Sequence, residues 1–242
     1  MNGAMTRDPS LKERLEGLES EALSRSLWAD GFARISGLMA AEQCASLIAA
    51  YDDDALYRTT VVMARHGFGR GTYRYFADPL PKVVGGLRSA LYRNLAPLAN
   101  AWNEALRLAE RYPPELEAYL AECAKAGQLR PTPLVLRYEA GDYNALHQDL
   151  YGERAFPLQV TIGLSERVNY SGGESVLVMQ RPRAQSVARV VTLEGGDALV
   201  FPTRYRPVEG THGTYRQNVR HGVSEVRSGL RFALGVIFHN AR

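Results

Sequence analysis

The chain has 242 residues, of which 45% are hydrophobic and 23% charged, and this composition excludes a disordered protein. Its formal net charge is only +3, which excludes a strongly basic field over the whole surface. The length suits either one larger all-β or α+β unit or two small domains.

Cysteine usage and the amino terminus indicate where the protein resides. Cys44 and Cys123 lie far apart and form neither a CxxC pair nor a zinc-binding spacing. The amino-terminal segment is polar and charged, without the apolar stretch of a secretory signal, and no later run reaches membrane-spanning length. We therefore expect a cytoplasmic protein that does not insert into a membrane.

Apolar residues recur at helical spacing through much of the first half of the chain. This pattern predicts helical regions over residues 9–29, 40–51 and 80–126. The last region contains prolines, and we expect it to break near Pro97 and again at Pro113 and Pro114. Together these helices should form a layer that covers one face of a sheet.

Residues 58–76 alternate glycines with arginines and aromatic residues after a predicted strand at 59–63. Two interpretations remain open for this segment: a plain surface loop, or a lid that grips the substrate, since such side chains can bind phosphates or stack on bases. Under the second interpretation Arg70, Tyr73 and Arg74 are the candidate substrate residues.

After Arg130 the chain changes to short segments rich in β-branched and apolar residues, separated by turn residues. Strands are predicted at 133–138, 157–164, 174–179, 186–193, 196–202 and 229–238. No repeat or linker is visible, so we expect a single domain over 1–242, with 1–130 as mainly helical support and possible lid, and 131–242 as the catalytic β-core. The predicted fold class is α+β: a double-stranded β-helix, jelly-roll and cupin-like, backed by a layer of α-helices.

His147 and Asp149 lie two residues apart in the run LVLRYEAGDYNALHQDL. On a strand, two such side chains project from the same face. An imidazole and a carboxylate on one wall supply two ligands of the facial triad that holds iron in non-haem oxygenases. The third must come from a distant segment, and we favour His221 over His212 because Arg231 follows it.

Arg231 begins a strand that is otherwise apolar, on the face that it shares with Ala233 and Gly235. Burying a guanidinium without an anion is costly. We therefore expect something negative to lie opposite Arg231.

Several motifs follow one another in order from Tyr138 to the end of the chain. They are Tyr138-Glu139-x-Gly141, His147-x-Asp149, Gly172-Gly173-Glu174, Gly196-Asp197 with Phe201-Pro202, and His221-Gly222-Val223 with Gly229 and Arg231. This part of the chain resembles the Fe(II)- and 2-oxoglutarate-dependent oxygenases of the prolyl-hydroxylase type. The amino-terminal half matches no motif of that family.

The resemblance implies that His147, Asp149 and His221 bind Fe(II) and form the catalytic centre. It also implies that Arg231 pairs with the distal carboxylate of 2-oxoglutarate, with Tyr138 hydrogen-bonding the same group. Thr161 alternates with apolar residues on its predicted strand, and it either lines the cosubstrate pocket or is an ordinary strand threonine. The implied cofactors are Fe(II), 2-oxoglutarate as cosubstrate, and O2.

The implied activity is that of a dioxygenase, which hydroxylates an unactivated carbon and releases succinate and CO2. The run HGVSEVRSGLR resembles prolyl hydroxylases most and favours a prolyl or related substrate, in a protein, a peptide or a small molecule. The alternative is an oxidative demethylase of alkylated nucleic-acid bases, although Leu150 stands where the well-known members have Asn. A non-catalytic cupin-like binding or sensor module is the alternative of another class.

Overall fold

The structure is a computed structural model, and it describes residues 10–150, 152–181, 183–211 and 213–242. The helices are α1 (Leu11–Glu16), α2 (Ser20–Ala29), α3 (Ala41–Ala49), α4 (Lys82–Ala105) and α5 (Leu116–Lys125). The strands of the first half are β1 (Ala33–Ile35), β2 (Tyr57–Val62), β3 (Gly69–Arg70) and β4 (Thr72–Phe76). Those of the second half are β5 (Leu134–Tyr138), β6 (Tyr143–His147), β7 (Leu158–Gly163), β8 (Tyr170–Gly172), β9 (Ser175–Met179), β10 (Val187–Val191), β11 (Ala198–Pro202), β12 (Tyr205–Gly210), β13 (Gly213–Val223), β14 (Val226–Gly229) and β15 (Arg231–Val236).

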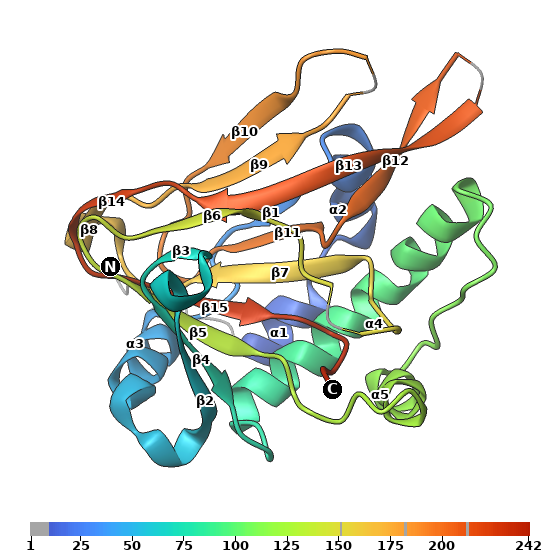
Figure 1. The fold of residues 1–242 in the computed structure, drawn as a ribbon. Coiled ribbons are helices and arrows are strands. Elements are labelled where there is room, and N and C mark those ends of the chain that lie inside the picture. The colour runs from blue at the N-terminus through green and yellow to red at the C-terminus, as the bar shows by residue number, and fades with distance from the viewer. Residues whose placement is uncertain (1–9, 151, 182, 212) are drawn as a thin grey trace, which may run out of the picture.

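Figure 1 shows two antiparallel sheets that face each other. Residues of both sheets line a cavity. The major sheet has the strand order β1-β11-β7-β15-β5-β4-β2, and the minor sheet has the order β10-β9-β13-β6-β3, with β12 paired to β13. A separate two-stranded pair is formed by β8 and β14. This arrangement confirms the predicted double-stranded β-helix with supporting helices.

The last strand, β15, shows how the sequence sets the two faces of the major sheet. Phe232, Leu234 and Val236 are buried in the main hydrophobic core, whereas the alternate residues Arg231 and Ala233 line the cavity. Side chains alternate between the faces of a strand, so one strand serves the core and the site at once.

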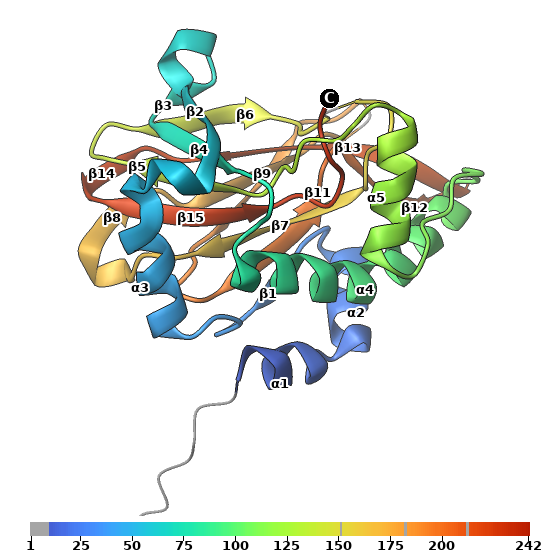
Figure 2. The same ribbon diagram turned by 90° about the horizontal axis from the view of Figure 1, so that it is seen from below.

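The helices lie against the outer face of the major sheet, where α1, α3 and α4 run beneath it (Figure 2). Their apolar sides share one core cluster with the outward residues of β5, β7, β11 and β15. Within the described part of the chain, none of these helices is long and apolar enough to cross a membrane.

The helical prediction was wrong in two places. The helix expected over 9–29 is divided into α1 and α2, because Gly17 caps the first, which opens on a capping box of Ser10 with Glu13. The break expected near Pro97 does not occur, since α4 continues through it. Pro97 and Arg93, whose carbonyl loses its hydrogen bond, both lie on the exposed side of α4, where water can satisfy that carbonyl.

The segment 58–76 is part of the sheets. Strands β2 and β4 pair with each other and extend the major sheet beyond β5, while Gly69 of β3 pairs with Asn144 of β6 in the minor sheet. The carbonyl of Phe68 also accepts a hydrogen bond of 2.9 Å from the backbone N–H of Ala145. The segment therefore joins the two sheets as a wall of the cavity.

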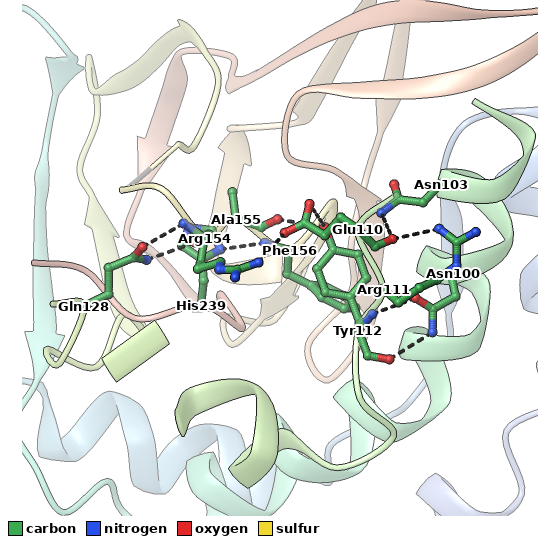
Figure 3. A network of polar contacts seen from close by, with 10 residues as sticks. All are labelled: Asn100, Asn103, Glu110, Arg111, Tyr112, Gln128, Arg154, Ala155, Phe156 and His239. Atoms are coloured by element: carbon green, nitrogen blue, oxygen red, sulfur yellow. Dashed lines mark hydrogen bonds and ion pairs between the residues drawn. The ribbon is translucent and has the colours of Figure 1, made fainter. Parts of the chain in front are cut away.

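A buried polar network holds the chain that follows Asp149 (Figure 3). Gln128 is fully buried, accepts from the backbone N–H of Arg154 at 2.7 Å and donates to its carbonyl at 2.9 Å. The backbone N–H of Phe156 donates to Nδ1 of His239 at 3.2 Å. His239 is thus a packing residue, and burial lowers its pKa to about 4.

We expect Gln128→Leu to lower the free energy of unfolding by about 2–4 kcal/mol, because buried groups left without partners cost about 1–3 kcal/mol each. Urea unfolding of the ligand-free protein measures this. Gln148→Leu is the matched control, since Gln148 is only partly buried and its carbonyl partners can bind water instead. Equal losses in the two variants would contradict the importance of this network.

Candidate metal centre and cosubstrate pocket

Three ligating side chains meet at the end of β6. His147 is the last residue of β6, Asp149 follows two residues later, and His221 lies on β13 as the direct cross-strand partner of His147. Nε2 of His221 lies 3.0 Å from Oδ2 of Asp149, and Nε2 of His147 lies 3.4 Å from Oδ1. The three candidate ligand atoms lie within 4.8 Å of one another, so they could hold one metal ion.

The hydrogen bonds around His147 aim it at this centre. Its Nδ1 lies 2.8 Å from the backbone carbonyl of Ala145, to which it donates. In the neutral ring that bond places the proton on Nδ1, so Nε2, which faces Asp149 and His221, carries the lone pair that could bind a metal, as in many histidine metal ligands. His212, the competing candidate, lies outside the described residues.

Burial and charge set the protonation of the three groups. Burial opposes the charged form of Asp149, but His221 and His147 outweigh it and hold the pKa of Asp149 well below its usual range. Burial lowers the pKa of His221 against the pull of Asp149. Burial also opposes the charge of His147, yet the hydrogen bond and charge of Asp149 prevail and raise its pKa. An ionised carboxylate beside a neutral His221 suits metal binding.

A second set of polar groups lies deeper in the same cavity. Tyr138 on β5 and Arg231 on β15 are cross-strand partners, and the guanidinium carbon lies 5.4 Å from the centre of the phenol ring. The Tyr138 hydroxyl and both Nε and Nη1 of Arg231 are buried without hydrogen-bond partners among the described residues. Unpaired buried donors of this kind are costly, and they fit the carboxylate of a bound acid.

The cavity that contains these groups has a volume of about 310 Å³. His147, Asp149, His221, Tyr138 and Arg231 all line it. Much of the remaining wall is apolar, with Leu134, Leu136, Leu177, Leu199 and Phe201 from both sheets. A metal ion and a small dicarboxylate therefore both have matching groups in one enclosed space.

Thr161 also lines the cavity, together with Gln159, which shares its face of β7. Nε2 of Gln159 lies 3.4 Å from Nε2 of His221. Gln159 lies two residues before Thr161 on an otherwise apolar strand, and a polar residue at that position was the available signal for its place in the site.

Comparison with known proteins gives the family. A family model described as an oxygenase, catalysing oxidative methylation of damaged DNA, matches residues 71–241, which is more than half of the chain. The chain belongs to this oxygenase family. Two relatives of the oxygenase in Mycobacterium tuberculosis, the uncharacterized proteins MT2286 (strain CDC 1551 / Oshkosh) and Rv2227 (strain ATCC 25618 / H37Rv), are each 50% identical over 167 residues, covering 69% of this chain and 72% of theirs.

Solved structures share the fold of the oxygenase at low identity. A prolyl-4-hydroxylase of Pseudomonas putida superimposes with a TM-score of 0.54 and 16% identity, over 92% of this chain and 99% of its own. A member of the 2OG-Fe(II) oxygenase family from Burkholderia pseudomallei gives a TM-score of 0.54 and 14% identity, over 93% of both chains. The oxygenase thus has the predicted fold of the 2-oxoglutarate- and Fe(II)-dependent enzymes, and its triad fits Fe(II), 2-oxoglutarate and O2 as cofactors.

The three candidate substrate residues of the oxygenase do not lie together. Tyr73 lines the cavity, and Arg70 is exposed on β3. Arg74 was wrongly assigned, because it is buried elsewhere: its Nη1 donates to the carbonyl of Tyr51 at 2.6 Å and its Nη2 pairs with Asp54. Adjacent residues of β4 point to opposite faces, so Tyr73 and Arg74 cannot serve one site.

We expect Gly71→Ala to displace Tyr138 and weaken 2-oxoglutarate binding by the oxygenase. Gly71 has a φ of 110°, and a Cβ there would lie 2.9 Å from the Tyr138 ring. Backbone strain alone should cost about 1–3 kcal/mol of stability. Gly67→Ala is the control, since Gly67 also has a positive φ of 69° but its Cβ would meet nothing within 4 Å. Calorimetric titration with 2-oxoglutarate in the presence of Mn(II) compares the two variants. Equal affinities for 2-oxoglutarate in Gly71→Ala and Gly67→Ala would contradict a displacement of Tyr138 by the new Cβ.

Proposed function

We propose that this oxygenase uses Fe(II) and 2-oxoglutarate to oxidise the N-alkyl group of a damaged nucleic-acid base. His147, Asp149 and His221 would hold Fe(II). The observation that carries the proposal is the buried pair Tyr138 and Arg231 in the cavity that contains this triad, because the Tyr138 hydroxyl and Nε and Nη1 of Arg231 have no hydrogen-bond partner among the described residues. Such a pair is what a bound diacid would satisfy.

The residues divide the work of the site between them. Arg231 and Tyr138 would bind the distal carboxylate of the cosubstrate, and Thr161 would contribute a hydroxyl to the wall beside it. Asp149 and the two histidines would hold Fe(II) at the wall of the same cavity. The apolar wall excludes water, which strengthens each of these charge interactions.

Fe(II) with 2-oxoglutarate and O2 would supply the oxidising power to convert a C–H bond into C–OH, with the second oxygen atom leaving in succinate and the lost carboxyl as CO2. On an N-methyl group the product is an N-hydroxymethyl group, which breaks down to the free base nitrogen and formaldehyde. The protein's own contribution is to hold the methyl carbon in the cavity near His147 and His221.

The substrate class rests on the family description, which names damaged DNA. That family is matched through sequence over residues 71–241, whereas the likeness to prolyl hydroxylases at 13–16% identity concerns the fold. We therefore place the nucleobase ahead of the prolyl substrate, although Leu150 stands where well-known demethylases have Asn.

A prolyl substrate is the second candidate, and the run HGVSEVRSGLR at 221–231 favours it. In that case the same site would hydroxylate a ring carbon of proline in a peptide or protein, and no formaldehyde would form. The arrangement of Fe(II) ligands and cosubstrate groups is the same for both candidates, so only the substrate can decide.

The deciding experiment offers the protein, with Fe(II), 2-oxoglutarate and O2, a panel of N-methylated oligonucleotides and a panel of proline peptides. We expect formaldehyde and a mass loss of one methylene unit from an oligonucleotide. A gain of one oxygen atom on a peptide without formaldehyde would transfer the assignment to prolyl hydroxylation. Absence of succinate under all conditions would leave a binding or sensor module.

A further inference from the structure

Strand β6 leads along the surface to the metal centre, ending at His147. It lies between β3 and β13, so the three strands form one continuous outer surface next to the cavity. We propose that this surface, which we call the β6 strip, binds a single strand of nucleic acid and delivers one of its bases to the cavity. The proposal rests on the function proposed above and adds to it where the strand lies and which residues hold it.

Exposed rings and apolar side chains gather on the β6 strip. Phe68 and Leu146 are 48% and 44% exposed and also line the cavity, and Tyr143 at the start of β6 is 39% exposed. The ring of Phe68 stacks on His66, with centroids 5.3 Å apart and planes inclined by 22°. Exposed apolar groups concentrated at a cavity mouth mark a binding surface, and flat rings there suit the faces of unstacked bases.

A β-bulge turns these side chains outward. The pairing of β6 with β13 shifts register between His221 and Val223, so Tyr143 and Leu146 are both exposed although they are three residues apart. Without the bulge, strict alternation would send one of them inward. The irregularity thus lets β6 present a contact surface to solvent and still aim His147 into the site.

Positively charged side chains lie on both sides of β6 within the strip. The turn at Met63–His66 and the strands β3, β6 and β13 contain Arg65, Arg70, Arg216 and Arg220 but no Asp or Glu. Arg70 is the cross-strand partner of Tyr143, and Arg220 precedes His221 and is exposed on the opposite face of β13. No carboxylate of the described residues lies within ion-pair distance of these four arginines, unlike exposed Arg25, which pairs with Glu21.

The combination of unpaired guanidinium groups and exposed rings selects nucleic acid over other polyanions. Phosphates would engage Arg70 and Arg220, and bases would stack on Phe68. An acidic peptide would form ion pairs with the arginines but would not stack on the exposed rings. A base also has to leave its stack before an enzyme can reach its N-alkyl group, which a single strand permits at the lowest cost.

Fluorescence anisotropy with a labelled oligothymidylate, measured over a series of salt concentrations, tests the strip. Arg70→Gln and Arg220→Gln should each reduce the slope of log affinity against log salt by about 0.7, the value for one phosphate contact with a single strand. Phe68→Leu should weaken binding about tenfold at an unchanged slope, and Phe68→Trp should restore it. Arg25→Gln on α2 is the matched control and should change neither quantity.

The proposal would be overturned if the slope of log affinity against log salt were the same in Arg70→Gln and Arg220→Gln as in Arg25→Gln. It would also be overturned if polyglutamate competed for the surface with the same affinity as the oligonucleotide. Thermal unfolding of each variant shows that it is folded, and all four positions are exposed, so substitution should be tolerated. Demethylation at the same rate in all variants would contradict a role of the β6 strip in substrate binding and would still support the proposed function. Strand binding with the expected slopes but without formaldehyde release would support the β6 strip as a binding surface and contradict the proposed demethylation.

Discussion

His221→Ala is expected to abolish ferrous binding. The side chain is one of the three candidate ligands, and its Nε2 lies 3.0 Å from Oδ2 of Asp149, another of them. Changing a residue that only orients a metal ligand typically costs about 10–100-fold in affinity, so loss of the ligand itself should cost at least about 100-fold. Calorimetric titration with Mn(II), a redox-inert substitute for Fe(II), measures this without requiring turnover.

His66→Ala is the matched control, because His66 is exposed and distant in sequence from the three ligands. His221→Gln guards against misfolding, since it preserves most of the buried volume. Mn(II) should raise the thermal unfolding midpoint of the wild type, as any ligand of the native state does, and should leave that of both His221 variants unchanged. Mn(II) affinity within a few-fold of wild type in His221→Ala would remove His221 from the metal centre.

The strand alternation in the second half of the chain predicted which residues face the cavity. In β15 the apolar residues split into a core-facing set and a set that shares its face with Arg231, and the structure places both sets accordingly. The same alternation left Thr161 open between the cosubstrate pocket and an ordinary strand position, and the structure places it on the cavity wall. Period-2 alternation is a local property, so a single sequence reveals it.

That reasoning could not identify contacts between residues that are far apart in the sequence. Arg74 stands beside Tyr73 in a segment for which the sequence left both a surface loop and a substrate lid open, and only the tertiary structure shows that it bonds to Tyr51 and Asp54. Strand β13 was missed because its outward face is polar and its inward face carries Gln217 and His221, so it lacks an apolar alternation. Polar residues at a functional site interrupt the alternation of apolar and polar residues by which a strand is predicted.

Arg88 and Arg231, the two least exposed of the buried arginines among the described residues, differ in a way that predicts opposite effects on stability. Arg88 is 2% exposed and donates to the carbonyls of Ile237 and Phe238 and to the side chain of Asn240. Arg231 is 3% exposed, and its Nε and Nη1 have no partner among the described residues. Arg88 is thus satisfied by the fold, whereas Arg231 remains to be satisfied by a ligand.

Arg231→Leu should therefore weaken 2-oxoglutarate binding by roughly 100-fold, because truncating one side of a buried charge pair costs about 2–5 kcal/mol. Mn(II) affinity should change little, since Arg231 is not among the three candidate ligands. Titration with Mn(II) first and 2-oxoglutarate second separates these two steps. Arg231→Lys should restore only part of the affinity, because an ammonium group cannot form the paired hydrogen bonds of a guanidinium.

The same variant should not destabilise the ligand-free protein and should raise its unfolding midpoint, because leucine removes a buried charge whose Nε and Nη1 lack hydrogen-bond partners in the described part of the chain. Arg88→Leu is the matched control and should lower the midpoint without changing the affinity for 2-oxoglutarate. Urea unfolding of the ligand-free proteins gives both values. A large loss of stability in Arg231→Leu together with an unchanged dependence on 2-oxoglutarate would show that Arg231 supports the fold and that the diacid is bound elsewhere.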